Sequence, residues 1–300
     1  MAEQAITQET PEISFESKRV NETKRFIRVF FRRGLVIFGM TVLLLFLIMS
    51  VFGPLFAPYD PNMQNLAAQL EKPSAQHVLG TDFIGRDTAS RLIYGARMSL
   101  MVGVVALGIA AIVGIIAGMA AGYYGSWVNA VIMRIMDALM AFPMILLALL
   151  LAGLLGGGLK NVMIALGVAL IPGYARLMCG QVLSIRENDY VMAGRSMGSS
   201  NWRLMFLHIL PNSFPPLIVL VTMQIGAAIM AEAGLSYLGI GISPPTASWG
   251  AMVSDGFPYV LTNPLLSFVP GLAIMMVVFA FNMVGDGLRD ALDPRLRGTI

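Results

Sequence analysis

The sequence predicts an all-α, polytopic membrane protein with six transmembrane helices. Hydrophobic residues make up 57% of the 300 residues, whereas charged residues make up only 12%. Soluble domains carry about 25% charged residues, so a chain this poor in charge needs lipid as a second apolar solvent. The mean hydropathy of +0.74 points the same way. Long charge-free stretches also occur, and a bilayer core of about 30 Å requires about 20 helical residues to cross it.

Six stretches meet this length requirement. The first, GLVIFGMTVLLLFLIMSVFGPLFA, is longer than the apolar region of a secretory signal and is expected to remain as a membrane anchor. The fourth is interrupted only by Arg176, near one end. Pro143 and Pro172 lie inside the third and fourth, where surrounding protein can satisfy the backbone groups that a kink frees. The expected spans are 34–56, 98–123, 131–155, 161–183, 214–236 and 264–286.

Basic residues set the expected orientation. A cluster of lysines and arginines precedes the first span and places the N-terminal tail, residues 1–33, in the cytoplasm. Six crossings return the C-terminal tail, 287–300, to the same side, and the loop 57–97 then lies outside. A patch for nucleic acid or for lipid headgroups is the alternative explanation of the cluster. Because the net charge is only +3 and the basic residues are not spread over one face, nucleic acid is not expected as a partner.

Residues suited to catalysis, metal binding or nucleotide binding are sparse. Cys179 is the only cysteine, and His77 and His208 are the only histidines, so neither a disulfide nor a metal site is expected. The glycine-rich stretch 153–161 lacks the Gly-Lys-Ser/Thr ending of a phosphate-binding loop. The sequence therefore predicts a non-catalytic membrane subunit that binds no cofactor and draws its energy from elsewhere. A stand-alone secondary transporter is the alternative, although no convincing internal repeat is found.

The segment 187–212, ENDYVMAGRSMGSSNWRLMFLHILPN, is polar and interrupts the apolar stretches around it. Asp189 is expected to cap a short helix, and Gly198 to end it, because glycine accepts the left-handed conformation of a helix stop. Pro211 is expected to mark the turn into the fifth span. A second short helix would follow a cap at Asn201 and carry on its apolar side Trp202, Met205, Phe206 and Ile209. Such a pair of helices at the cytosolic membrane surface is either an interfacial connector or a docking element for a cytosolic partner.

This segment resembles the cytoplasmic coupling loop of bacterial ABC importer permeases, whose pattern is Glu-Ala-Ala, three residues, Gly, and then Leu-Pro. The matching residues are Met192, Ala193, Gly194, Gly198, Leu210 and Pro211. Five further stretches resemble the oligopeptide, dipeptide and nickel permeases: LGTDFIGRD, YGARMSL, MRIMDALMAFP, GLSYLGIGISPPTASWGAM and FNMVGDGLRDALDP. The resemblance extends from about 34 to 297 and is to the C-type permease. It implies the type I ABC importer permease fold, with the family's transmembrane domain at 97–286.

The resemblance also implies a function. The chain is expected to be a permease subunit of an ATP-driven importer in the bacterial inner membrane, with short peptides as substrate and nickel or another small solute as the alternative. Its expected partners are membrane lipid, a second homologous permease, two ABC ATPases that hold ATP and Mg, and an extracytoplasmic substrate-binding protein. The residues expected to couple to the ATPases are Asp189, Tyr190, Met192, Ala193, Gly194, Gly198, Arg203, His208, Leu210 and Pro211.

Several of these residues have expected roles. Ala193 and Gly194 would leave room for the ATPase surface, and Arg203 would meet an acidic residue on it. Met192 stands where family members often have Glu, which could complete a capping box with Asp189. Its loss is expected to weaken the helix start by about 1 kcal/mol or less.

Two other groups of residues are candidates. Glu232, near the outer end of the fifth span, is costly at membrane depth unless it faces water or a partner. It is expected either to bind a peptide's amino group or to form a structural pair at the helix end. Gly114, Gly118 and Gly122 recur every four residues, so they share one helix face that a second helix can approach closely. That helix is expected to belong to the same chain, with a second subunit as the alternative.

Arg134 and Asp137, three residues apart at one end of the third span, are expected to pair with each other. Asp286–Arg289 and Arg289–Asp293 also stand at helical spacing, which is expected for a solvated exit from the membrane, with contact with the ATPase as the alternative.

Overall fold

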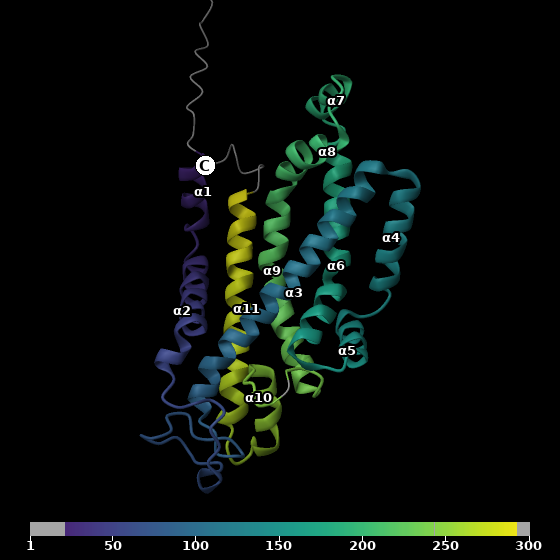
Figure 1. Ribbon diagram of the computed structural model, residues 1–300. Coiled ribbons are helices and arrows are strands. Elements are labelled where there is room, and N and C mark those ends of the chain that lie inside the picture. Colours follow the sequence, from purple (N-terminus) through teal and green to yellow (C-terminus); the bar gives the residue numbers. More distant parts are fainter. Residues whose placement is uncertain (1–21, 243, 293–300) are drawn as a thin grey trace, which may run out of the picture.

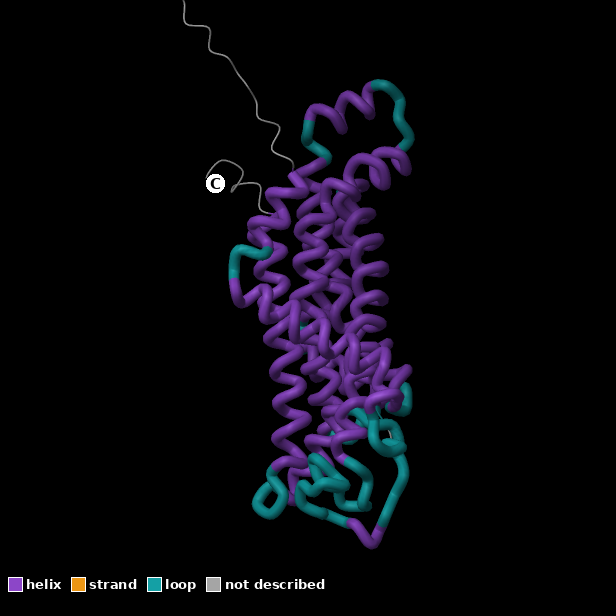
Figure 2. Tube along the Cα trace, turned by 90° about the vertical axis from the view of Figure 1, so that its left-hand side faces the viewer, coloured by secondary structure: helices purple, strands orange, loops and turns teal. Residues whose placement is uncertain are grey.

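The computed structural model describes residues 22–242 and 244–292, in which helices run along the length of the molecule (Figure 1). The outer parts of both predicted tails, residues 1–21 and 293–300, lie outside the described residues. The helices are α1 Glu22–Phe30, α2 Gly34–Phe56, α3 Thr88–Tyr124, α4 Ser126–Met140, α5 Met144–Leu154, α6 Gly158–Ile185, α7 Asp189–Ser196, α8 Asn201–Arg203, α9 Leu210–Tyr237, α10 Trp249–Gly256 and α11 Leu265–Leu292. The loops gather mainly at the two ends of the bundle, and the longer ones lie at the end opposite α7 (Figure 2).

The predicted fold class is confirmed. Five helical stretches are long and apolar enough to cross a membrane: α2, α3, α6, the continuous stretch Asn201–Tyr237, and α11. The pair formed by α4 and α5 gives a sixth span if the two helices are counted together. Within the described residues the chain is therefore a helical bundle with five single candidate spans, or six if the bent pair is one span, against the six that the sequence predicts.

The third span differs from the single helix expected at 131–155. It consists of α4 and α5, which are bent by 90° with respect to each other. Pro143 immediately precedes α5 and has an extended backbone with ψ of 132°. Proline has no N–H to donate, and it disfavours helical geometry in the residue before it. The proline expected to kink the span therefore separates two helices.

Helix α3 begins at Thr88, well before the expected start at 98. Asp87 caps it, since its Oδ2 accepts a hydrogen bond from the backbone N–H of Ser90 at 2.7 Å. Its 37 residues make a helix about 55 Å long, which exceeds a bilayer core of about 30 Å. Figure 1 shows α3 crossing the bundle obliquely, so it links the loop 57–87 to the end that carries α7.

Gly114, Gly118 and Gly122, the glycines of α3 at four-residue spacing, lie against α6 of the same chain. A Cβ atom at Gly114 would stand 2.5 Å from the Cβ of Tyr174, and one at Gly122 would stand 2.7 Å from the Cβ of Val182. At Gly118 the added atom would overlap the carbonyl oxygen of Ala175, which is backbone and cannot turn aside. The two backbones therefore approach each other as closely as glycine allows.

Helix α10 lies at the end of the bundle opposite α7 and packs against α3, α9 and α11 (Figure 1). Trp249 is fully buried, and its indole N–H donates to the carbonyl oxygen of Leu92 at 2.9 Å. Gly95 of α3 makes room for this ring, because a Cβ there would stand 2.7 Å from the indole. The tryptophan therefore fixes α10 to the outer end of α3.

Ion pairs join α4 to α6 and the start of α2 to α11, and the expected Arg134–Asp137 pair is wrong. Asp137 of α4 pairs with Arg176 of α6 at 2.5 Å, in place of Arg134. Asp290 of α11 pairs with Arg33 at 2.8 Å, and no Asp286–Arg289 pair forms among the described residues. Packing brings an opposite charge from a neighbouring helix closer than the residue three positions along. Asp293, the other residue at helical spacing from Arg289, lies outside the described residues.

Candidate functional site

The 187–212 segment projects beyond the bundle at the end that carries α7 (Figure 1). The cap of α7 is Asn188, one residue earlier than expected, and Asp189 is the first helical residue. A carboxylate in the first turn is still favourable, because it lies at the positive end of the helix dipole. The shift also means that Met192 costs no capping box, contrary to the expected weakening of the helix start. Met192 occupies the fourth helical position, where a glutamate could not reach back to cap with Asp189.

Helix α7 ends at Ser196, and Gly198 has a φ of 80°, the left-handed conformation on which the expected stop depends. The cap of the next helix is Ser200, whose Oγ accepts from the backbone N–H of Arg203 at 3.3 Å. The expected cap, Asn201, has a different role: its Oδ1 accepts a hydrogen bond from the hydroxyl of Tyr123 at 2.8 Å. This bond ties the start of the helix to the end of α3.

The second short helix expected in this segment does not exist as a separate element. Helical structure runs without interruption from Asn201 to Tyr237, through a π-helical stretch at Leu204–Ile209. Pro211 lies in the first turn of α9 and causes no turn in the chain. A π-helical stretch widens the backbone just before the proline, so the ring is accommodated without a break. His208 and Leu210 are thus part of one long helix.

Small and apolar residues attach α7 to this long helix. Val191 and Leu204 are buried, and a Cβ at Gly194 would stand 3.1 Å from a methyl group of Leu204. The small size of Gly194 therefore serves packing within the chain, whereas it was expected to leave room for a partner. Ala193 is exposed. Helix α7 therefore rests directly on the start of the Asn201–Tyr237 helix.

The outer side of the segment carries large apolar side chains that the chain itself leaves uncovered. Met197 is 80% exposed and Trp202 is 68% exposed, and Tyr190 and Met192 are nearly half exposed. We refer to these four residues as the apolar tip. Trp202 was expected on the apolar side of the second short helix, where Met205 and Ile209 are buried; it is largely exposed, and its ring contacts that of Phe206, with centroids 4.0 Å apart. No role was expected for Met197, which directly precedes Gly198, the residue at which α7 was expected to stop.

A cavity of about 310 Å³ lies beneath α7, between it and the end of α3. Arg195 lies over the Tyr123 ring, 5.8 Å from its centroid. Arg186 donates to the carbonyl oxygen of Gly122 at 2.9 Å and pairs with Glu187 at 2.9 Å. Arg203 is exposed on the outside of the helix. The segment therefore combines an apolar tip with a polar, arginine-lined hollow, and it is held in place by α3 and α6.

Glu232 lies inside the chain, near the outer end of α9. Its side chain is fully buried, and its Oε1 accepts a hydrogen bond from the Ser236 hydroxyl at 2.6 Å, while Oε2 has no partner among the described residues. The hydroxyl of Ser236 in turn accepts from the backbone N–H of Ile242 at 3.2 Å. Ser99 of α3 and Ser248, the cap of α10, lie beside the carboxyl group. This burial among three elements favours the structural alternative over contact with a peptide.

Replacing Glu232 with lysine is expected to lower the free energy of unfolding by about 3–5 kcal/mol, because the lysine would bury an unpaired charge. Glu232→Gln keeps the shape and an oxygen that can accept from Ser236, so it is expected to cost about 1 kcal/mol or less. Thermal unfolding of the purified variants in detergent measures both effects. A glutamine variant that unfolds like the wild type yet fails to transport would contradict a purely structural role.

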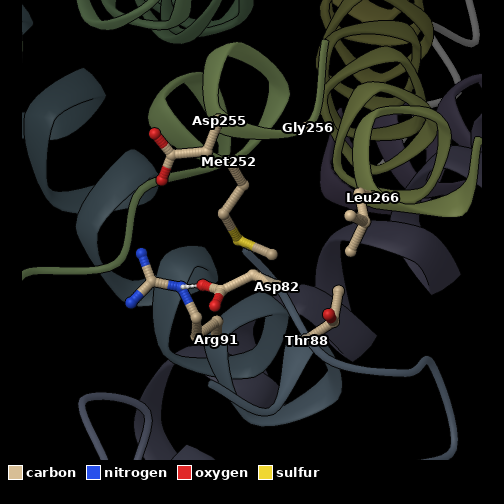
Figure 3. Close-up of a pocket in the computed structure, with 7 residues that line it drawn as sticks. All are labelled: Asp82, Thr88, Arg91, Met252, Asp255, Gly256 and Leu266. Carbon is tan, nitrogen blue, oxygen red and sulfur yellow. Dashed lines mark ion pairs between the residues drawn. The ribbon is translucent and has the colours of Figure 1, made fainter. Parts of the chain in front are cut away.

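Four charged residues link the external loop to α3 and α10. Arg86 donates through Nε to Asp82 at 2.6 Å, and its Nη2 lies 3.3 Å from Asp255 of α10. Arg91 lies 3.7 Å from the same carboxylate of Asp82, and Figure 3 shows the two side chains facing each other below Met252. Burial raises the pKa of Asp255 although both arginines act to lower it. These four side chains therefore form one connected network of ion pairs.

Comparison with known proteins identifies the family. Residues 110–298 match the model described as binding-protein-dependent transport system inner membrane component, and residues 22–73 match the N-terminal transmembrane domain of oligopeptide transport permease C. The first match includes the whole 187–212 segment and the second includes α1 and α2. The chain belongs to this permease family. The predicted resemblance to C-type peptide permeases is confirmed.

Several curated relatives align with the permease over most of their length. The probable D,D-dipeptide transport system permease protein DdpC of Escherichia coli (strain K12) is 42% identical over 88% of this chain and 89% of its own. The oligopeptide transport system permease protein OppC of Bacillus subtilis (strain 168) is 41% identical over 88% and 86%. The glutathione transport system permease protein GsiD of Escherichia coli O1:K1 / APEC is 39% identical over 91% and 90%.

The fold of the permease also matches a solved structure. The MetNI methionine ABC transporter, described in inward-facing conformations, aligns with a TM-score of 0.54 over 68% of this chain and 96% of that chain. The sequences are 17% identical in the aligned part, so this likeness concerns the fold alone. The type I permease architecture predicted from the sequence is confirmed.

Proposed function

We propose that this permease is one of two membrane subunits of an ATP-driven importer that carries short peptides across the bacterial inner membrane. The 187–212 segment is its contact with the ATPase subunits. The observation that carries the proposal is the apolar tip: four large side chains are exposed on a segment whose Val191 and Leu204 are buried against the rest of the chain. Exposed apolar side chains of this kind mark protein contacts.

The continuity of the long helix supports a mechanical role for the segment. A force on α7 passes through Gly194 and Leu204 into the helix Asn201–Tyr237, which is unbroken as far as the buried Glu232 and Ser236. There the helix contacts α3 and α10 at the outer end of the bundle. Movement of the ATPases at one end of the permease would thus reach the opposite end through a single rigid element.

Peptides are the substrate that the relatives support. The names of three of them specify D,D-dipeptide, oligopeptide and glutathione, and glutathione is itself a short peptide. The complete importer in our proposal contains a second homologous permease, two ABC ATPases with ATP and Mg, and an extracytoplasmic binding protein. Both ends of the permease chain lie in the cytoplasm. Import of nickel by the same architecture is the second candidate.

Reconstitution tests this function directly. The permease is co-purified with its partner subunits, placed in liposomes with the binding protein, and supplied with radiolabelled dipeptide or nickel. We expect uptake of the dipeptide that requires ATP and the binding protein, and no uptake of nickel. Uptake by the chain alone without nucleotide would contradict the proposal in favour of a secondary transporter, and uptake of nickel only would reassign the substrate.

A further inference from the structure

One side of helix α1 packs against the rest of the protein. Phe26 and Phe30 lie one helical turn apart with their rings stacked at 5.7 Å, and Phe30 is buried. Both pack in a cluster with Val36, Leu288 and Ala291, so this side of α1 is covered by α11 and by the start of α2. The position of α1 on the bundle is therefore fixed by apolar contacts.

A second apolar stripe on α1 has no cover. Ile27 follows the half-buried Phe26, and Phe31, the first residue after α1, follows the buried Phe30, so each is turned about 100° from the phenylalanine before it. The backbone N–H of Phe31 donates to the carbonyl oxygen of Ile27 at 3.0 Å, which holds the two one turn apart. Ile27 is 50% exposed and Phe31 is 46% exposed.

Arginines form the third stripe. Arg28 is exposed and lies a further roughly 100° around α1, next to Ile27, and Arg32 is exposed in the turn that follows α1, next to Phe31 in the sequence. Arg25 is half-buried on the same side. The nine residues from 25 to 33 contain four arginines and no acidic residue. Within the described residues only Arg33 of these four has a carboxylate partner, Asp290, so the other three positive charges are left for a ligand.

The surroundings of α1 indicate which ligand this is. Helix α2 follows three residues after α1, and it is the least buried of the five single candidate spans, with 17% of its most apolar window buried. Its exposed faces are apolar and charge-free, as lipid requires. Figure 1 shows α1 at the same end of the bundle as α7 but on the far side of α11 from it. The exposed side of α1 thus continues the lipid-facing side of α2 into the headgroup layer, away from the apolar tip.

We propose that α1 is a binding site for anionic phospholipid. Arg28 and Arg32 contact the phosphate of the headgroup through charge-assisted hydrogen bonds, and Ile27 and Phe31 contact the upper part of the acyl chains. An apolar stripe beside a basic one is the arrangement of helices that lie in the membrane interface, and it draws on both apolar burial and charge. The positive charges of Arg28 and Arg32, both exposed, select anionic over zwitterionic headgroups. A bound lipid would hold α1 against α11 and fix the entry of α2 into the bilayer.

Native mass spectrometry of the full-length permease in detergent tests the proposal, with phosphatidylglycerol and phosphatidylcholine as probes. We expect the wild type to bind phosphatidylglycerol more tightly than phosphatidylcholine. The double variant Arg28→Gln/Arg32→Gln is expected to bind phosphatidylglycerol about 25-fold more weakly, from about fivefold for each arginine near an anionic surface. The matched control is Arg97→Gln/Arg134→Gln, which removes the same charge from two exposed arginines elsewhere and is expected to leave binding unchanged.

Further arms separate lipid from other ligands. Ile27→Ser/Phe31→Ser keeps every charge and is expected to weaken the binding of both lipids, and millimolar inorganic phosphate is expected not to compete. Equal binding of the two lipids by the wild type would overturn the proposal, as would unchanged selectivity in the arginine variant. Displacement of the lipid by phosphate alone, or cross-linking of α1 to an ATPase subunit in the intact complex, would also overturn it.

Discussion

Replacing Gly118 with valine is expected to prevent the permease from reaching its stable fold. A Cβ at this position overlaps the carbonyl oxygen of Ala175, so α3 and α6 would have to separate. Overpacking of a close interface costs about 3 kcal/mol or more when the obstacle is backbone, and separation would also disturb the contacts at Gly114 and Gly122. The higher helix propensity of valine opposes this loss by only a few tenths of a kcal/mol, about 0.5 at most. Fluorescence-detected size exclusion and thermal unfolding in detergent measure the yield and stability of the variant.

The same helix supplies the control. Gly108 has no atom within 4 Å of the position that a Cβ would occupy, so Gly108→Val is expected to fold with wild-type yield. This pair of variants isolates the α3–α6 contact from the general effect of removing a glycine from a helix. If both variants behaved alike, the close approach of the two helices could not be the reason for the glycines.

Truncation of the apolar tip is expected to uncouple the importer without unfolding the permease. Met197 and Trp202 are the most exposed of its four side chains. Buried anchors in protein interfaces contribute about 2 kcal/mol or more each, which corresponds to about 30-fold weaker binding of the ATPase for one truncation. Met197→Ala is therefore expected to lower ATP-dependent peptide uptake in liposomes by at least about tenfold, and Trp202→Ala by a similar factor. The thermal stability of the Met197→Ala permease is expected to change little, because the exposed Met197 side chain makes few contacts within the chain.

The matched control for this truncation lies at the other end of the molecule. Leu261 is 95% exposed and follows α10, so Leu261→Ala removes a comparable apolar side chain where no ATPase is proposed. Wild-type uptake is expected for this control. Full uptake by both tip variants would show that the exposed side chains do not contribute to coupling, and the role assigned to the tip would be withdrawn.

Much of the fold could be predicted from the sequence, because lipid imposes simple rules on length and charge. Six apolar stretches, a basic cluster before the first and glycines at four-residue spacing all depend on local pattern. The corner at Pro143 could not be predicted, because a proline within a span produces either a kink or a break, and packing decides which. The pairing of Asp137 with Arg176 likewise depends on which helices become neighbours.

The 187–212 segment shows the same limit at the level of single residues. Gly198 could be predicted, since its conformation is a local property. The caps at Asn188 and Ser200 were each missed by one residue, because neighbouring residues such as Asp189 and Asn201 are equally good caps by type. The exposure of Trp202 could not be predicted, since a tryptophan next to Met205 and Phe206 looks like part of a buried stripe. In the structure Met205 is buried at the start of the π-helical stretch, whereas Trp202 lies just before that stretch and stays exposed.

The most direct test of the account is a single labelling and cross-linking measurement at Met197. The chain's only native cysteine, Cys179, is buried, so Met197→Cys places one accessible thiol on the tip. In sealed membrane vesicles a membrane-impermeant maleimide is expected to reach this thiol only from the cytosolic side. A bifunctional reagent is expected to join it to an ATP-hydrolysing subunit that co-purifies with the permease. Labelling from the external side, or a complex in which the tip cross-links to no nucleotide-hydrolysing neighbour, would contradict the central claim.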